Sequence, residues 1–499
     1  MDNLWSLLER SSRNFPEALA LRFPAGKRYL TWLDLKQAAL ALARELQGRG
    51  IEKGDRVGLF LPNTPEFVIS FFAASYLGAV VVPINGKLTA PEISYILADS
   101  GAKALLYAAD KGETVKEAVE KAGVGVLLAD TDFPLQDAGG DSDYREGGYA
   151  EAADLAEILY TSGTTGRPKG VMLTNYAVIA VGQMMAYEAQ IYHGDNVLLL
   201  MPLTHSAPLN LFVVGAVWAG AQMTLGEFTP QALLQLAAGE GATHFFGAPV
   251  AYQLLCRMPN LAEYDLSAMK LWIYGGAPIG REQVLNWQKL LPGKFMSVYG
   301  LTEAGPNGLA LRPAEHAVKA GSIGGRGSIN TAVKIVREDG REAGPGETGE
   351  IALKTASVML GYYNNSGATA SALRENWLLT GDVALKDEDG YVWILDRKKD
   401  MIISGGVNVY PKEIEDLLLT HPQVADVAVI GVPHPDWGES VCAVVVPHPG
   451  GEPSLETIRQ FCQGKLADYK VPKLLRLVPA LPRNSSGKLL KYELRAERA

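Results

Sequence analysis

The chain has 499 residues, 47% of them hydrophobic, which is enough for large cores and about three domains. With 55 acidic and 46 basic residues its formal net charge is −9, which argues against a general nucleic-acid or anionic-membrane binder. Three cysteines without CxxC spacing indicate reduced thiols in the cytoplasm. We expect neither a signal peptide nor a membrane span, because the longest apolar run, 209–225, contains polar residues and favours a buried helix.

The first 150 residues alternate between predicted strands and helices. Helices are predicted at 32–47 and 65–76, and strands at 56–61, 79–83, 102–107 and 125–128. A strand followed by a helix and another strand is a βαβ unit, which implies a parallel sheet. Residues 137–148, rich in Gly and Asp, predict a loop.

A glycine- and hydroxyl-rich stretch at 160–171 predicts a phosphate-binding loop. It follows an apolar run, 156–160, that predicts a strand, and it precedes an apolar-periodic segment from Val171 onward. Glycines let backbone N–H groups converge on an anion, hydroxyls add donors, and Lys169 adds a positive charge. The spacing is not that of the common P-loop, because Arg167 and Pro168 precede the lysine. A Gly/Ser/Thr-rich linker is the alternative.

Residues 190–310 continue the alternation, with strands predicted at 196–201, 222–225, 244–247 and 271–274. The fold class predicted for this large N-terminal body is therefore doubly wound α/β. In such folds, ligands bind beyond the carboxyl ends of the strands.

Three predicted strand ends carry unusual chemistry. The strand at 271–274 enters 275–278, whose small residues let a flat ligand lie against the backbone. The strand at 295–298 enters 299–303, which offers an aromatic face, a close approach at a glycine, a hydroxyl and a carboxylate suited to Mg²⁺. His205 follows the strand at 196–201, where an ordinary polar loop residue is the alternative.

From about 320 to 396 the pattern changes to short strands and turns. Strands are predicted at 331–336, 349–353, 358–363, 377–379 and 391–395, which together form a β-rich module. Residues 380–382 are expected to end a strand, where Asp382 could accept hydrogen bonds from a ribose diol. A turn aspartate is the alternative.

The last hundred residues again show an α/β pattern. It follows a charged cluster, 396–400, and a glycine pair, 405–406, which together suit a hinge. Helices are predicted at 411–420 and 454–466, and strands at 424–432, 440–446 and 474–478. We expect a body of residues 1–396 and a small mobile domain of residues 397–499. The last loop, 482–489, carries Lys488, for which a solvated tail lysine is the alternative.

Together these motifs resemble those of the adenylate-forming superfamily, which includes acyl-CoA synthetases, peptide synthetase adenylation domains and firefly-type luciferases. The general pattern of the chain is similar to bacterial fatty-acid CoA ligases. The motifs occur in the family's order over nearly the whole chain, at residues 160–170, 274–278, 299–303, 380–382, 396–400, 405–406 and 482–488. The resemblance implies a two-step reaction. A carboxylate first attacks ATP to give an acyl-adenylate and pyrophosphate, and a thiol, usually coenzyme A, then displaces AMP.

The resemblance also implies a role for each motif. Lys488 would bridge the acid and the α-phosphate, Thr302 would contact the α-phosphate, and Glu303 and Thr164 would bind Mg²⁺. The small domain would then rotate about Lys399 and carry Gly405 and Gly406 to the thiol tunnel. The remaining ATP contacts would be Thr161, Ser162, Gly163, Thr164, Thr165, Gly166 and Lys169 at the phosphates, Gly276, Ala277, Pro278, Tyr299 and Gly300 at the adenine, and Asp382 and Arg397 at the ribose.

The resemblance places an acid pocket that carries no Arg, Lys or Asp, so a second carboxylate or an ammonium on the substrate would lack a partner. The expected substrate is an apolar monocarboxylic acid, most simply a medium- or long-chain fatty acid, with an aryl acid as the alternative substrate. The alternative function is that of a stand-alone enzyme that loads a carrier protein. A homodimer is left open. The pocket residues are His205, Leu209, Phe212, Val213, Phe246, Gly247, Gly275, Gly300 and Leu301.

One segment departs from the family pattern. The family commonly has an aromatic residue just before the histidine and a glycine soon after it, whereas this chain has Thr204-His205-Ser206-Ala207-Pro208. His205 is still expected to gate the acid pocket or to assist the second step.

Overall fold

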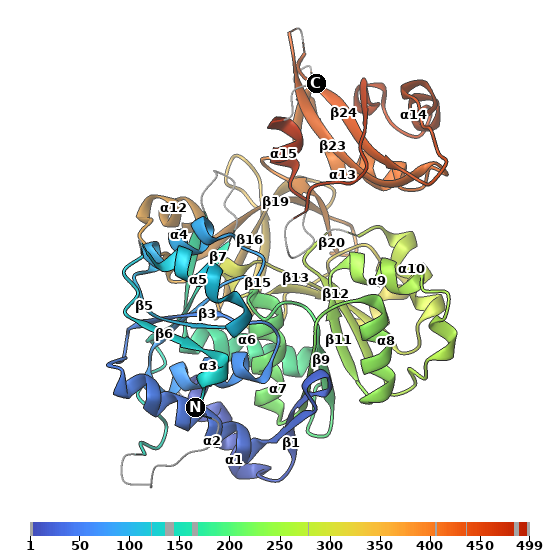
Figure 1. The fold of residues 1–499 in the computed structure, drawn as a ribbon. Coiled ribbons are helices and arrows are strands. Elements are labelled where there is room, and N and C mark those ends of the chain that lie inside the picture. Colours follow the sequence, from blue (N-terminus) through green and yellow to red (C-terminus); the bar gives the residue numbers. More distant parts are fainter. Residues whose placement is uncertain are drawn as a thin grey trace.

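The computed structural model of the chain has a large body and a smaller C-terminal domain that sits on top of it (Figure 1). The body contains two mixed α/β sheets and a third, antiparallel sheet, and the C-terminal domain has a sheet of its own. This architecture confirms the predicted fold class. The residues that the structure describes are 3–120, 122–134, 144–161, 168–277, 279–404, 407–435, 437–483 and 489–496.

The seven-stranded sheet of the body has the order β17-β8-β7-β4-β3-β5-β6, and its β7, β4, β3, β5 and β6 run parallel. Its strands are β3 (Arg56–Phe60), β4 (Val80–Pro83), β5 (Ala102–Tyr107), β6 (Val126–Ala129), β7 (Leu155–Thr161), β8 (Lys169–Thr174) and β17 (Gly361–Tyr362). The connecting helices are α3 (Pro65–Leu77), α4 (Ala90–Ser100) and α5 (Gly112–Val119). All 13 residues of α3 are buried, because the helix packs between the sheet and α2 (Trp32–Gly48).

The predicted phosphate loop connects two antiparallel strands, β7 and β8, rather than a strand and a helix. The apolar segment that follows it forms β8 first and then the helix α6 (Asn175–Glu188), which is capped by the Thr174 hydroxyl. The register pairs Thr161 with Lys169, so these two residues face each other at the base of the loop.

The eight-stranded sheet has the order β14-β13-β12-β11-β9-β10-β1-β2, with an antiparallel strand at each edge and parallel strands between them. Its strands are β1 (Leu19–Phe23), β2 (Arg28–Thr31), β9 (Asn196–Leu199), β10 (Gln222–Leu225), β11 (His244–Gly247), β12 (Leu271–Gly275), β13 (Lys294–Gly300) and β14 (Gly308–Leu311). The helices that follow its strands along the chain include α8 (Pro230–Gly239), α9 (Pro249–Cys256), α10 (Arg281–Leu290) and α11 (His316–Lys319), whereas α1 (Leu4–Asn14) packs against α2 and α3.

The predicted buried helix at 209–225 is three elements. A π-helical segment, η5 (Ala207–Val213), continues into α7 (Val214–Ala219), and β10 follows. The helix ends early because Gly220 takes a left-handed conformation with φ of 67°.

The β-rich module is an antiparallel sheet of β15 (Thr331–Val336), β16 (Thr348–Thr355), β18 (Leu373–Arg374), β19 (Trp377–Lys386) and β20 (Val392–Arg397), with α12 (Ser366–Ala372) beside it. Two details of the prediction are wrong. Residues 380–382 lie inside β19 instead of ending a strand, because Gly381, with φ of 73°, lets the strand continue past an irregular turn of the backbone. The strand predicted at 358–363 shrinks to β17, which pairs with β8 and so belongs to the seven-stranded sheet.

The C-terminal domain has a five-stranded sheet covered by helices. Its elements are β21 (Ile402–Ser404), β22 (Val407–Val409), β23 (Val424–His434), β24 (Gly438–Pro447), β25 (Leu474–Leu477), α13 (Pro411–Leu418), α14 (Leu455–Cys462) and α15 (Lys491–Ala496). The short 3-10 turns of the described chain include η1 (Pro24–Gly26), η2 (Ala109–Lys111), η3 (Asp130–Asp132), η6 (Leu261–Glu263), η7 (Thr302–Ala304) and η8 (Pro313–Glu315) in the body, and η9 (Asp468–Lys470) in the C-terminal domain. Over the described part of the chain, no helix is both long and apolar enough to cross a membrane.

Candidate active site

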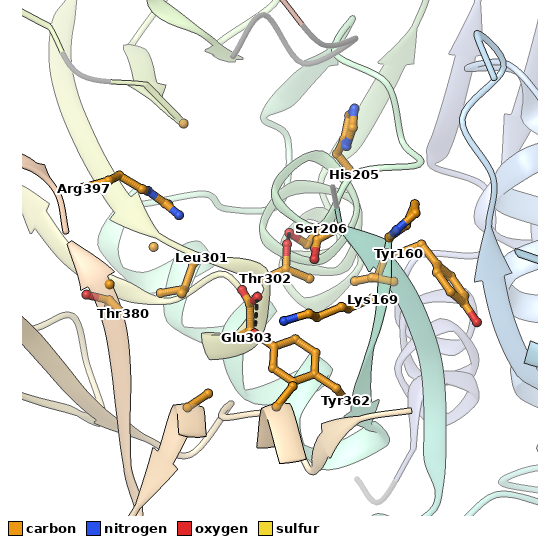
Figure 2. Close-up of a pocket in the computed structure, with 18 of the residues that line it drawn as sticks. Tyr160, Lys169, His205, Ser206, Leu301, Thr302, Glu303, Tyr362, Thr380 and Arg397 are labelled. Atoms are coloured by element: carbon orange, nitrogen blue, oxygen red, sulfur yellow. Dashed lines mark hydrogen bonds between the residues drawn. The ribbon is translucent and has the colours of Figure 1, made fainter. Parts of the chain in front are cut away.

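A cleft of about 1250 Å³ lies where the three sheets of the body meet the C-terminal domain. Its lining comes from the ends of β7 and β8, from η7 directly after β13, from β19 and from the end of β20. In Figure 2, Arg397 and Thr380 lie on one side of this space and His205 and Tyr160 on the other. Residues far apart in the sequence therefore share one cavity, as expected for strand ends in an α/β fold.

Glu303 is held at the floor of the cleft by the segment that contains β17. The Tyr362 hydroxyl donates a 2.8 Å hydrogen bond to Glu303 Oε1, and the Met359 amide donates to the Glu303 carbonyl at 2.9 Å. Burial, and then the nearby carboxylate, raise the pKa of Tyr362, so the phenol stays protonated and keeps donating. The glutamate therefore presents its carboxylate in a fixed orientation.

Lys169 reaches toward the same carboxylate from β8 (Figure 2). Its Nζ lies 5.1 Å from the centre of the Tyr362 ring, within the range of a cation–π contact. A cation and a carboxylate on one wall suit a phosphate and the metal ion that accompanies it.

Thr302 and His205 also line the cleft. The hydroxyls of Thr302 and Ser206 are 2.9 Å apart, and His205 Nε2 lies 3.3 Å from the amide nitrogen of Asn85. Burial lowers the pKa of His205 to about 4, so the imidazole is neutral at pH 7. A neutral histidine there can exchange a hydrogen bond with an uncharged group without repelling a cation.

Asp382 is the centre of a second cluster at the edge of the cleft. Its side chain accepts a 2.6 Å hydrogen bond from the Tyr299 hydroxyl and an ion pair from Arg397 Nε at 2.8 Å. Burial lowers the pKa of Arg397, but the nearby acidic groups, Asp382 foremost among them, together outweigh burial and the pKa is raised. Both oxygens of this buried carboxylate are therefore anchored by hydrogen bonds or ion pairs.

Two glycines at this edge are required by close packing. A β-carbon at Gly275 would lie 2.4 Å from the Val298 carbonyl oxygen, and one at Gly300 would lie 2.3 Å from the Pro306 carbonyl oxygen. Gly276, with φ of 79°, has open space where a side chain would be. Gly275, Gly276, Ala277, Tyr299 and Gly300 also line a second cavity of about 490 Å³ that extends beneath the C-terminal domain.

The residues predicted to form the acid pocket divide into two groups. His205, Gly300 and Leu301 line the cleft, and Gly275 lines the second cavity. The other group lies behind the cleft in the core, and the described lining of these two cavities does not include it: Leu209, Phe212, Val213, Phe246 and Gly247. Within this group the rings of Phe212 and Phe246 stack with centres 5.0 Å apart.

Several predicted site residues lie outside the described residues: Ser162, Gly163, Thr164, Thr165, Gly166, Pro278, Gly405, Gly406 and Lys488. Their described neighbours Thr161 and Lys169 line the cleft, as does Lys399, whose pKa burial lowers. Over the described ranges there is no group of three or more His, Cys, Asp or Glu side chains that could hold a metal ion. Glu303 would therefore need ligands from outside these residues, which fits Mg²⁺, an ion commonly bound by one carboxylate plus substrate phosphates.

The sequence analysis missed the residues that orient the site, namely Tyr362, Ser206, Asn85 and Glu350. Glu350 accepts from the Gly381 amide at 2.9 Å and pairs with Lys398 at 3.2 Å. Each of these residues meets its partner across 31 or more positions of sequence. Only the folded chain brings them together, and no local pattern indicates such a contact.

Family models match most of the chain: "AMP-binding enzyme" over residues 8–363 and "AMP-binding enzyme C-terminal domain" over residues 413–488. The chain is 38% identical to a feruloyl-CoA synthase from Amycolatopsis sp., with 97% of each protein covered. It is 35% identical to the long-chain-fatty-acid–CoA ligase FadD13 of Mycobacterium tuberculosis, with 100% of this chain and 99% of the relative covered. Among solved structures, ATP-bound MatB from Rhodopseudomonas palustris matches with a TM-score of 0.89 at 30% identity, over 99% of both chains.

Proposed function

Since this chain belongs to the AMP-binding enzyme family and is an AMP-forming acyl-CoA synthetase, we propose that the acid it joins to coenzyme A is an apolar monocarboxylic acid. The observation that carries the proposal is the cleft itself, which gathers groups suited to each part of an acyl-adenylate. In the first step a carboxylate oxygen bonds to the α-phosphorus of ATP and pyrophosphate leaves. In the second step the thiol sulfur bonds to the acyl carbon, and AMP leaves.

We assign the phosphate subsite to the side of the cleft that holds Lys169 and Glu303. Lys169 would neutralise phosphate oxygens, and Glu303, fixed by Tyr362, would supply the carboxylate for a Mg²⁺ ion that neutralises charge on the phosphates. Thr302 would donate to the α-phosphate, and the family resemblance assigns Thr164 as a second metal ligand. Such a step depends mainly on positioning and charge neutralisation.

We assign the nucleoside subsite to the backbone wall at 275–277 and to the Asp382 cluster. The bare glycines let a flat base approach the main chain, beside the Tyr299 ring. Asp382 has its two oxygens held by Tyr299 and Arg397 and can accept further hydrogen bonds from ribose hydroxyls through its remaining lone pairs.

A medium- or long-chain fatty acid is the first candidate for the substrate. The implied pocket residues are uncharged, and FadD13, a similar protein, is named for long-chain fatty acids. An aryl acid is the second candidate, because a 38% identical relative is a feruloyl-CoA synthase.

We place the boundary between body and C-terminal domain after residue 396 and the hinge at Lys399. The last strand of the β-rich sheet, β20, ends at Arg397, and the first strand of the C-terminal sheet, β21, starts at Ile402. A hinge between these strands would let the domain turn without breaking either sheet. The three free thiols, Cys256, Cys442 and Cys462, support a cytoplasmic location.

The test is pyrophosphate release and thioester formation with Mg·ATP over a panel of short, medium and long fatty acids, benzoates and cinnamates, each with and without coenzyme A. A maximum of kcat/KM on medium or long fatty acids supports the first candidate, and a maximum on a ring acid supports the second. Turnover restricted to amino acids or dicarboxylates would contradict the proposal. Glu303→Gln serves as the inactive control, and Tyr362→Phe as the matched variant that keeps the carboxylate but loses its orienting bond.

A further inference from the structure

Glu157 is a glutamate in the core of the body. It lies on β7, four residues before that strand ends at Thr161, and its exposed fraction is 0%. Its Oε1 accepts a short hydrogen bond from the side-chain amide of Asn210, which lies in η5 and is also fully buried. In the sequence, Glu157 stands within a predicted apolar strand, 156–160.

The second polar atom of each side chain has no partner. Glu157 Oε2 and Asn210 Oδ1 are both buried and form no hydrogen bond in the structure. Two carbonyl-type oxygens cannot satisfy each other, and leaving both unpaired in an apolar core is unfavourable. A proton between them would satisfy both atoms at once.

The surroundings offer nothing that would stabilise an ionised carboxylate. Within the described ranges, no Lys, Arg or His forms an ion pair with Glu157, and its only hydrogen-bond partner is the neutral amide of Asn210. An isolated charge in such a place would be strongly disfavoured. In agreement, burial raises the pKa of Glu157 to about 8, although the Asn210 bond lowers it.

We propose that Glu157 is a protonated positioning residue, which forms a cyclic pair with Asn210 through two hydrogen bonds. The carboxyl O–H donates to Asn210 Oδ1 while the amide N–H donates to Glu157 Oε1. The acid and the amide are planar groups of the same width, so one pair of bonds brings the other pair into register. All four polar atoms are then satisfied without a net charge.

This pair connects two parts of the active site. Glu157 lies on the strand that leads to Thr161 and the phosphate side, whereas Asn210 lies in the π-helical segment that follows His205 and Ser206. The Leu209 amide donates to the His205 carbonyl at 3.2 Å, and Ser206 touches Thr302, so a shift of η5 would displace the floor of the cleft. π-Helical segments are rare and often occur at functional sites. The pair thus fixes η5 relative to β7.

The protonation state can be measured directly in the whole enzyme. The infrared C=O stretch of a protonated carboxylic acid, recorded at pH 7 as the difference between wild type and Glu157→Gln, should show one band that the variant lacks. Absence of that band overturns the proposal. This measurement does not depend on which acid the enzyme uses.

The positioning role is tested by kinetics with the best acid of the panel, and this part depends on the proposed function. Glu157→Gln can form the same two bonds, so its kcat and its KM for the acid should stay within about twofold of wild type. Glu157→Leu should raise the KM for the acid at least about fivefold while changing the KM for ATP less. Equal effects of Gln and Leu would overturn the proposal.

A double variant separates positioning from stability. In Glu157→Leu/Asn210→Leu no polar atom is left unpaired, so the melting temperature should recover relative to Glu157→Leu. The KM for the acid should remain raised, because the link between β7 and η5 is still missing. Recovery of both quantities would show a merely structural role and overturn the proposal.

Discussion

Glu157 and Asp396 are both buried carboxyl groups, but they lie in different regions and are stabilised differently. Glu157 lies in the interior of the body against a neutral amide. Asp396 lies where the body meets the C-terminal domain, with Lys491 Nζ 3.9 Å away and the Lys412 amide donating at 3.0 Å. Burial raises the pKa of Asp396 to about 6, a rise that the Lys491 charge limits. Near pH 7 the interior therefore holds a neutral acid, whereas the interface holds an ionised one.

The difference follows from what each region has to do. Interior strands and helices stay together, so a neutral pair that water never reaches is sufficient. If the C-terminal domain turns about Lys399 as proposed, this interface would expose its polar groups, and Lys491, Asp396 and Glu415 could each be hydrated once they separate. Ionic contacts are therefore better suited to the junction, and a neutral acid–amide pair to the core.

The largest loss of activity is expected from a change of Lys488, which lies outside the described residues. Lys488→Ala should reduce acyl-adenylate formation by about 10²–10³-fold, because the positive charge that the family resemblance assigns to the transferring phosphate would be lost. Thioester formation from supplied acyl-adenylate should stay near the wild-type rate, since the lysine would serve only the first step. The two half-reactions are measured separately by pyrophosphate exchange and by thioester release. Equal loss in both would contradict the assigned role.

A smaller effect is expected from the charged cluster on the body side. Asp382→Ala should raise the KM for ATP about 10–100-fold, because it removes charge-assisted bonds and leaves Arg397 half-buried without its partner. Tyr299→Phe, which loses one hydrogen bond to the same carboxylate, is the matched control, with an expected rise of about 2–10-fold. Initial rates at varied ATP measure both. If the KM for the acid changed instead, the ribose assignment would be wrong.

The interface cluster itself can be broken with Lys491→Met. Asp396 and Glu415 would then share a buried site without the lysine that pairs with them, at a cost of about 3 kcal/mol to this domain arrangement. Lys491→Arg keeps the charge and is the control. Faster proteolysis between residues 397 and 402 in the Met variant, with little change in the Arg variant, is the expected result. Equal cleavage of both variants would argue against an ionic junction.

The mildest test is the pH dependence of stability. The folded pKa of Glu157, about 8, is raised above its ordinary value of 4.5, so the stability contributed by this proton is full below pH 4.5 and is lost as the pH rises to about 8. The melting temperature of wild type should therefore fall relative to Glu157→Gln by about 2 °C or more between these limits. A constant difference across this range would mean that Glu157 does not titrate.

The sequence alone predicted those features of the site that depend on residues near one another in the chain. The small residues at 275–277 and the Tyr-Gly-Leu-Thr-Glu run at 299–303 sit at strand ends, as their patterns predicted. The sequence did not predict features that depend on the folded backbone or on residues far apart in the chain. Tyr362 reaches Glu303 only because the two-residue β17 joins the edge of another sheet, and Asp382 lies within a strand because Gly381 allows an irregular backbone.

The buried pair shows a further limit of sequence patterns. Glu157 stands among apolar residues of a predicted strand, and periodicity alone cannot distinguish an exposed glutamate from a protonated one in the core. Its partner Asn210 is 53 positions away, in a segment predicted as an ordinary helix. The number of unsatisfied buried atoms, which requires coordinates, is what identifies the pair.

The hydrogen bond from the Met359 amide to the Glu303 carbonyl has a practical consequence for engineering. The chain leaves the cleft after Glu303, forms β14, β15 and β16, and returns to within 2.9 Å of its point of departure. Within this segment, the turn between β15 and β16 at Asp339 and Gly340 is exposed to solvent. A peptide tag or sensor domain inserted after Gly340 would thus lengthen a segment whose two ends are already bonded to each other, and it should leave the Glu303 carboxylate in place.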